Sequence, residues 1–193
     1  MPSEPAGSLS LLLHAHLPFV RHPEYPDFLE EDWLFEAITE TYLPLLRMMD
    51  RLWRDGIDFR LALTVTPPLC EMLVDPLLQE RYRRRLHALL DLAERQARAR
   101  RGTPFEDAAA WYAWDLGETR TLYEDELGGW ILPRLREYQD RGRLEIATCA
   151  ATHGLLPLMA TDEARYAQVQ VAVRHRVKHF GCRPRSIWLP EWA

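Results

Sequence analysis

Cysteine is scarce in this sequence, and long apolar runs are missing from it. The 193 residues include only 3 cysteines, Cys70, Cys149 and Cys182, an odd number without the spacing of a metal site. Such cysteines predict reduced thiols and a cytoplasmic setting. No stretch approaches the roughly 18 consecutive apolar residues that span a bilayer, so a membrane is not an expected partner.

An excess of positive charge is missing as well. The formal net charge is −5 at pH 7, which does not favour binding to nucleic acid. The arginines that gather between Arg81 and Arg101 are interleaved with Glu80, Asp91 and Glu94, a pattern typical of a solvated helix face. Hydrophobic residues make up 47% of the chain and charged residues 27%, as in globular proteins. We therefore expect no nucleic-acid partner.

Strand-like and helix-like patterns alternate along the chain. Strands are predicted at 9–13, 59–66, 144–149 and from Ile187, and helices at 33–55, 69–101, 105–140 and 161–180. This order predicts a parallel α/β architecture.

Two histidines stand at the end of the first predicted strand. Residues i and i+2 of a strand share one face, so His14 and His16 are expected to point the same way. Pro18 cannot continue a central strand. Because the carboxyl ends of parallel strands surround the functional site, both imidazoles are expected there.

Two further strand ends carry side chains that can take part in binding or catalysis. The strand ending at Cys149 runs into small residues and then His153 and Gly154, and small residues let a ligand approach the backbone. The last strand stops on Glu191, close after Trp188. Aromatic faces pack on sugar rings, and a carboxylate can attack an anomeric carbon, so this pattern favours a sugar site.

Three segments in this order resemble glycoside hydrolase family 57, most closely its α-1,4-glucan branching enzymes. They run from His14 to Phe19, from Leu144 to Gly154 and from Trp188 to Glu191. Trp192 departs from the pattern, because branching enzymes usually carry Cys there. The resemblance implies an α/β fold, a parallel (β/α) barrel of the distorted seven-stranded type. Residues 1–193 would supply about its first four β/α units, with a helical insertion near 69–140.

The same resemblance implies site residues and a reaction. Glu191 matches the nucleophile of a retaining mechanism, His14, His16 and His153 match residues that line the donor-sugar subsite, and Trp188 is inferred to contact sugar. The implied activity is 1,4-α-glucan branching in glycogen biosynthesis, without a cofactor or metal, on an α-1,4-glucan such as amylose or a glycogen-like polymer.

The general acid of the family is an Asp on a later strand, and no residue here matches it. We therefore expect a chain truncated before the general acid, inactive by itself, which self-associates or pairs with the missing C-terminal portion.

Two alternatives stay open at this point. A metal-dependent hydrolase could use His14 and His16 with His153 and Glu191 as ligands, since a His-x-His pair at a strand end also suits zinc. A chain without the acid could instead be an inactive glucan-binding or assembly fragment.

The predicted insertion is rich in aromatic residues. At this density we expect them to pack in the core or against another domain, and not to form a sugar platform; they are Trp111, Tyr112, Trp114, Tyr123 and Trp130.

Overall fold

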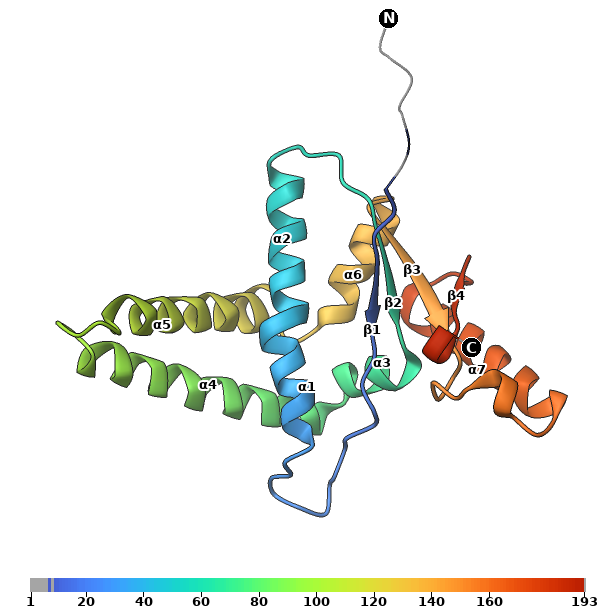
Figure 1. Cartoon of the computed structure of the whole chain (residues 1–193), viewed down its shortest axis with the longest axis horizontal. Coiled ribbons are helices and arrows are strands. Elements are labelled where there is room, and N and C mark those ends of the chain that lie inside the picture. The colour runs from blue at the N-terminus through green and yellow to red at the C-terminus, as the bar shows by residue number, and fades with distance from the viewer. Residues whose placement is uncertain (1–6, 8, 193) are drawn as a thin grey trace, which may run out of the picture. The chain divides into compact units, whose positions relative to one another are not determined.

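The computed structural model describes residue 7 and residues 9–192. The chain divides into two compact units (Figure 1). The first unit comprises Met1–His16, Asp58–Cys70 and Leu135–Ala193, and the second comprises Leu17–Ile57 and Glu71–Arg134.

The first unit is built on a parallel sheet of 4 strands in the order β1-β2-β3-β4 (Figure 1). All three neighbouring pairs are parallel, with Leu13 opposite Leu63, Leu63 opposite Ile146 and Cys149 opposite Trp188. The prediction of a parallel α/β architecture is confirmed. The strands are β1 (Leu12–Ala15), β2 (Leu61–Val65), β3 (Leu144–Cys149) and β4 (Ile187–Trp188).

The first strand lies further along the chain than predicted. The sequence predicted it at 9–13, whereas β1 runs from Leu12 to Ala15 and includes His14. The reason is the pairing of β1 with β2, which continues to Ala15 opposite Val65. The imidazole of His14 is therefore carried on the strand itself, where the hydrogen bonds between β1 and β2 hold its backbone rigidly.

The middle of the sheet is apolar, as expected for strands covered on both faces. Leu63 and Val65 of β2 are buried, as are Leu144 and Ile146 of β3. The helix α7 (Asp162–Phe180) contacts β3 and buries Phe180.

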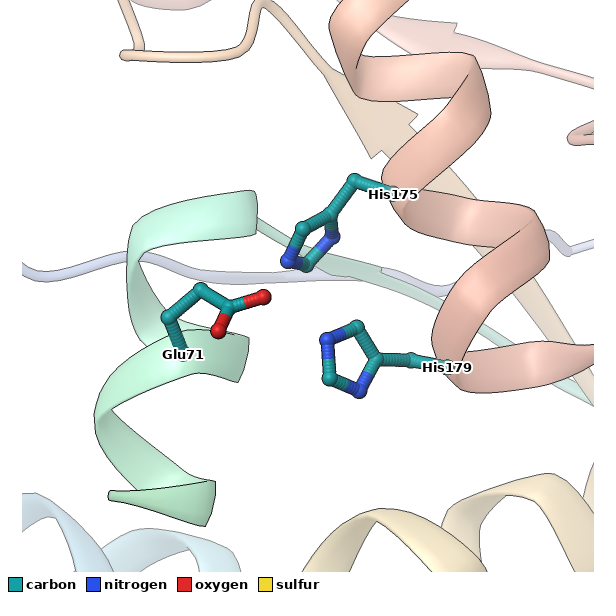
Figure 2. Close-up of side chains that lie close together, drawn as sticks. All are labelled: Glu71, His175 and His179. Atoms are coloured by element: carbon teal, nitrogen blue, oxygen red, sulfur yellow. The ribbon is translucent and has the colours of Figure 1, made fainter.

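Both ends of α7 follow from its sequence. The Thr161 hydroxyl accepts a hydrogen bond from the Ala164 amide at 3.2 Å, which caps the first turn. Gly181 ends the helix at φ 78°, a left-handed conformation that glycine adopts without steric cost. His175 and His179 lie one turn apart on this helix, with ring centroids 4.4 Å apart (Figure 2).

In the second unit, the predicted helix at 33–55 is continuous but changes its pitch. The α1 helix (Glu31–Ala37) passes through the π-helical segment η1 (Ile38–Tyr42) into α2 (Leu43–Arg54). Pro44 has no amide hydrogen to donate, and the wider turn lies directly before it. A proline that would otherwise kink the helix is accommodated in this way.

The remaining helices include an antiparallel pair, α4 and α5, that lie side by side (Figure 1). The predicted helical segment at 69–101 is divided at Asp75, whose Oδ1 caps α4 by accepting from the amides of Leu77 and Leu78 at 2.9 and 3.1 Å. The elements are α3 (Pro67–Val74), α4 (Pro76–Ala99), α5 (Glu106–Arg120), η2 (Thr121–Glu126), α6 (Ile131–Asp140), η3 (Leu156–Leu158) and η4 (Pro190–Trp192).

Arg81 is an exception to the predicted solvated face of α4. It is buried, forms an ion pair with buried Glu31 of α1, and donates to the carbonyl oxygens of His22 and Tyr25. A buried ion pair is tolerated only where further hydrogen bonds satisfy its donors, as they do here. The loop between β1 and α1 is therefore anchored to α4.

The aromatic residues of the predicted insertion are mostly exposed, so the core accounts for few of them, and packing against another domain stays a prediction. Tyr123 is 1% exposed, but Trp111, Tyr112 and Trp114 are between 52% and 59% exposed and Trp130 is 48% exposed. In α5 the apolar side chains are spread around the helix, so one packed face cannot cover them all.

No described helix combines the length and the apolar character needed to cross a membrane.

Candidate active site

The predicted site residues lie together in the first unit. His14 belongs to β1 and His16 follows it, His153 follows β3, and Trp188 ends β4, with Glu191 three residues later. The rings of His14 and Trp188 stack with centroids 4.9 Å apart, although β1 and β4 are the outermost strands of the order. The sheet therefore curls, as part of a barrel does.

The three imidazoles form a stack. The centroids of His16 and His153 are 3.7 Å apart with 19° between the ring planes, and His14 lies 5.1 Å from His153. We call these rings, together with Trp188, the ring cluster. It offers both flat apolar faces and ring nitrogens, which is the combination that pyranose rings and their hydroxyls require.

Two side chains that the sequence analysis did not select hold the imidazoles in place. His16 Nδ1 lies 3.1 Å from the hydroxyl of buried Thr66, and His153 Nδ1 lies 2.9 Å from Cys149 Sγ. Burial raises the pKa of the Cys149 thiol to about 11, so the sulfur keeps its proton at neutral pH. An S–H that donates to Nδ1 leaves the proton of neutral His153 on Nε2.

A sequence signal for these two residues existed. Thr66 stands just past β2 before Pro67, and Cys149 is the last residue of β3, so both occupy the strand ends that carry the histidines. Their small side chains did not suggest chemistry, and only the distances show which imidazole each one contacts.

His153 Nε2 faces the candidate nucleophile. It lies 3.7 Å from Glu191 Oε1, the His153 side chain is 8% exposed, and the Glu191 side chain is 73% exposed. Both residues have positive φ, 56° for His153 and 53° for Glu191, which non-glycine residues adopt at a cost. Such conformations concentrate at functional sites, where the surrounding structure maintains them.

The cluster holds its imidazoles neutral. Burial, together with the neighbouring rings of His153 and His14, lowers the pKa of His16 to about 4. Burial also lowers the pKa values of His14 and His153, although the charge of Glu191 partly opposes both shifts. At neutral pH each ring therefore has one N–H donor and one acceptor nitrogen, of which the Nδ1 atoms of His16 and His153 are already in contact with Thr66 and Cys149.

The stacking also bears on the zinc alternative. The lone pair of an imidazole nitrogen lies in the plane of the ring, and a metal bound by several imidazoles sits where those planes converge. His16 and His153 instead face each other nearly in parallel at 3.7 Å. Rings in this arrangement fit the packing of a sugar and contacts with its hydroxyls better than they fit the ligation of one metal ion by both imidazoles.

A model of glycosyl hydrolase family 57 matches residues 10–193. The chain belongs to this family. The predicted resemblance is thereby confirmed, and with it the assignment of the fold to the distorted (β/α) barrel type, of which this chain supplies the first strands.

Solved structures and a curated relative agree with this assignment. The chain is 39% identical over 97% of its length to the 1,4-alpha-glucan branching enzyme TK1436 of Thermococcus kodakarensis, of which it covers 27%. It superposes on the alpha-amylase AmyC of Thermotoga maritima with a TM-score of 0.88 and 45% identity, over 94% of this chain and 35% of that one. For the family 57 branching enzyme of Pyrococcus horikoshii the TM-score is 0.89 with 36% identity, over 96% and 34%. The chain thus spans about a third of the length of these relatives.

Proposed function

We propose that residues 1–193 supply the nucleophile and the donor-sugar subsite of a retaining α-glucan-active enzyme, whose reaction is 1,4-α-glucan branching. The observation that carries the proposal is the position of Glu191, a carboxylate held at positive φ and 3.7 Å from the His153 ring. The branching enzymes among the similar proteins support the choice of branching, while AmyC, named an alpha-amylase, makes hydrolysis the competing outcome.

In this proposal Glu191 attacks the anomeric carbon of an α-1,4-glucan. The new ester bond forms as the glycosidic bond breaks, and the hydroxyl of an acceptor glucan then resolves the intermediate with net retention. Neutral His14, His16 and His153 bind donor-sugar hydroxyls, and the Trp188 ring packs on a sugar face. None of these steps needs a metal or an organic cofactor.

The departing sugar oxygen needs a proton from a second carboxylic acid, about 5 Å from the nucleophile. We propose that a later part of the protein supplies this acid, since the relatives are about three times as long as this chain. The proposal includes a cytoplasmic location and a glycogen-like substrate, which rest on the cysteine usage and on the relatives.

The nucleophile can be tested without the acid. A 5-fluoro-α-maltosyl fluoride has fluoride as its leaving group, which departs without protonation, and the ring fluorine slows breakdown of the ester. Residues 1–193 should gain the mass of one fluorinated maltosyl group, and peptide mapping should place it on Glu191. The change E191Q should abolish labelling, because an amide does not form the ester.

The control E163Q alters another exposed glutamate of the first unit and should label normally. Labelling of E191Q at the normal rate would contradict the assignment of the nucleophile. Labelling that is lost in EDTA and restored by zinc would support the metal-dependent alternative instead.

A further inference from the structure

The first unit contains a polar hollow at the edge of the sheet opposite the ring cluster. Its volume is about 480 Å³, within the range of small-molecule sites. Arg60 and Arg143 directly precede β2 and β3, and Arg185 lies two residues before β4. Since the ring cluster gathers at the carboxyl ends of the strands, the hollow is separate from the glucan site.

Positive charge dominates the lining. Arg176 of α7 and Arg183 join the three arginines at the strand starts, and the carboxylates of the lining are Asp140 and Glu145. Carboxylates neutralise only part of this charge: outside the lining, Asp58 forms an ion pair with Arg143. Asp140 lies 3.7 Å from Arg136, which is not part of the lining, whereas Glu145 lies 4.0 Å from Arg185 and its charge also acts on Arg176.

Arg176 shows that the charge is built into the fold. Its residue is 4% exposed, its Nε donates to the Ile146 carbonyl oxygen at 3.1 Å, and its Nη2 donates to Gln139. Its Nη1 is buried and has no hydrogen-bond partner among the described residues. A buried charged donor without an acceptor is costly, so an acceptor at this place would stabilise the protein.

The chemistry of the missing acceptor follows from the guanidinium. Its planar fork matches two oxygens of a phosphate or carboxylate, and arginine binds phosphate bidentately. Burial lowers the pKa of Arg176, and the Cys182 sulfur, which also lines the hollow, opposes this shift. Several arginines around one hollow favour an anion of more than one charge.

We propose that this hollow binds a small phosphorylated molecule, a phosphomonoester or a diphosphate, as a second ligand in addition to glucan. The phosphate oxygens contact the arginines at the starts of β2, β3 and β4 and meet the free donor of Arg176. The inference does not depend on the reaction proposed for Glu191.

Pyrophosphate is the probe for the test, by titration calorimetry on residues 1–193. We expect saturable binding that weakens as sodium chloride is raised, since the attraction is between exposed charges. The change R183A/R185A removes two exposed arginines and should raise the Kd by about tenfold or more, the loss of one charge-assisted contact. The matched change R95A/R101A removes two exposed arginines of the second unit and should leave the Kd within about twofold.

Cys182 provides a local reporter for the same site. It is exposed and lines the hollow, whereas Cys70 and Cys149 are buried, so neutral iodoacetamide should modify Cys182 first. Saturating pyrophosphate should slow this modification in the unchanged chain and in R95A/R101A. The proposal is overturned if pyrophosphate shows no saturable binding, if both double variants lose affinity equally, or if Cys182 reacts at the same rate with and without pyrophosphate.

Discussion

Uncharged neighbours contact the imidazoles of the ring cluster and influence their protonation. Cys149 and Thr66 each approach one Nδ1, at 2.9 and 3.1 Å, and burial suppresses protonation of the rings. The imidazoles are therefore neutral before any ligand arrives, and the Cys149 thiol sets the tautomer of His153. Two predictions belong to this scale.

The first concerns the tautomer of His153. In C149A the Nδ1 loses its donor, so the ring should populate both tautomers, and labelling by the fluorinated maltosyl fluoride should slow about five- to tenfold, the value of one hydrogen bond. The ¹⁵N chemical shifts of the imidazole report the tautomer directly. C149S keeps a donor and should restore both readouts; unchanged ¹⁵N shifts in C149A would argue against this role.

The second concerns stability at low pH. The pKa of His16 is about 4 in the folded chain against an ordinary 6.5, so between these values the unfolded chain binds the proton more readily. The contribution of neutral His16 is present above pH 6.5 and is lost as the pH falls toward 4. Urea unfolding measured from pH 4 to 7.5 should show that the free energy of unfolding depends less steeply on pH in H16N than in the unchanged chain. Equal slopes in H16N and in the unchanged chain would refute the assignment.

At the scale of elements, the fold depends on a few long-range polar contacts. Asp75 caps α4 and also accepts from Arg21 Nε at 2.6 Å, and Arg81 of the same helix holds the loop that precedes α1. These contacts join the loop after β1 to a helix more than 50 positions later in the chain. The α4 helix thus adds long-range contacts to those that the loop forms with its own residues, such as the ring contact of His22 with Phe28.

Breaking the Arg81 ion pair should therefore be costly. R81A leaves Glu31, which is 1% exposed, as an unpaired buried charge, and should reduce the free energy of unfolding by about 3–5 kcal/mol. R95A removes an exposed arginine of the same helix and should change it by less than about 0.5 kcal/mol. Denaturant unfolding of both variants checks this, and equal small effects would show that the pair is not stabilising.

At the scale of the whole molecule, this chain corresponds to about a third of its relatives, and two predictions of the sequence analysis stay predictions. One is that residues near 69–140 are an insertion into the barrel. The other is that residues 1–193 lack activity and self-associate or pair with a further portion.

The predicted inactivity and association of residues 1–193 are directly measurable. Without a general acid the sugar leaving group departs unprotonated, and such assistance is typically worth about 10²–10⁴-fold. Residues 1–193 should therefore form no detectable branches in iodine-stained amylose, while still reacting with the activated fluoride. Light scattering should show a species larger than 22.6 kDa. A monomer that branches amylose at an ordinary enzymatic rate would mean that the acid lies within this sequence.

The sequence by itself determined the features that depend on neighbouring residues. Alternation and turn residues located β2, β3, β4 and the extent of α7, and three ordered segments indicated the family and placed His14, His153 and Glu191 at strand ends. Tertiary structure decided what lies beside what. In the folded chain His16 stacks on His153, the Cys149 thiol contacts His153 Nδ1, Arg81 is buried and Trp111 is exposed. The physical reason is that propensity and periodicity act over a few residues, whereas burial and ring contacts arise between segments that only the packed fold brings together.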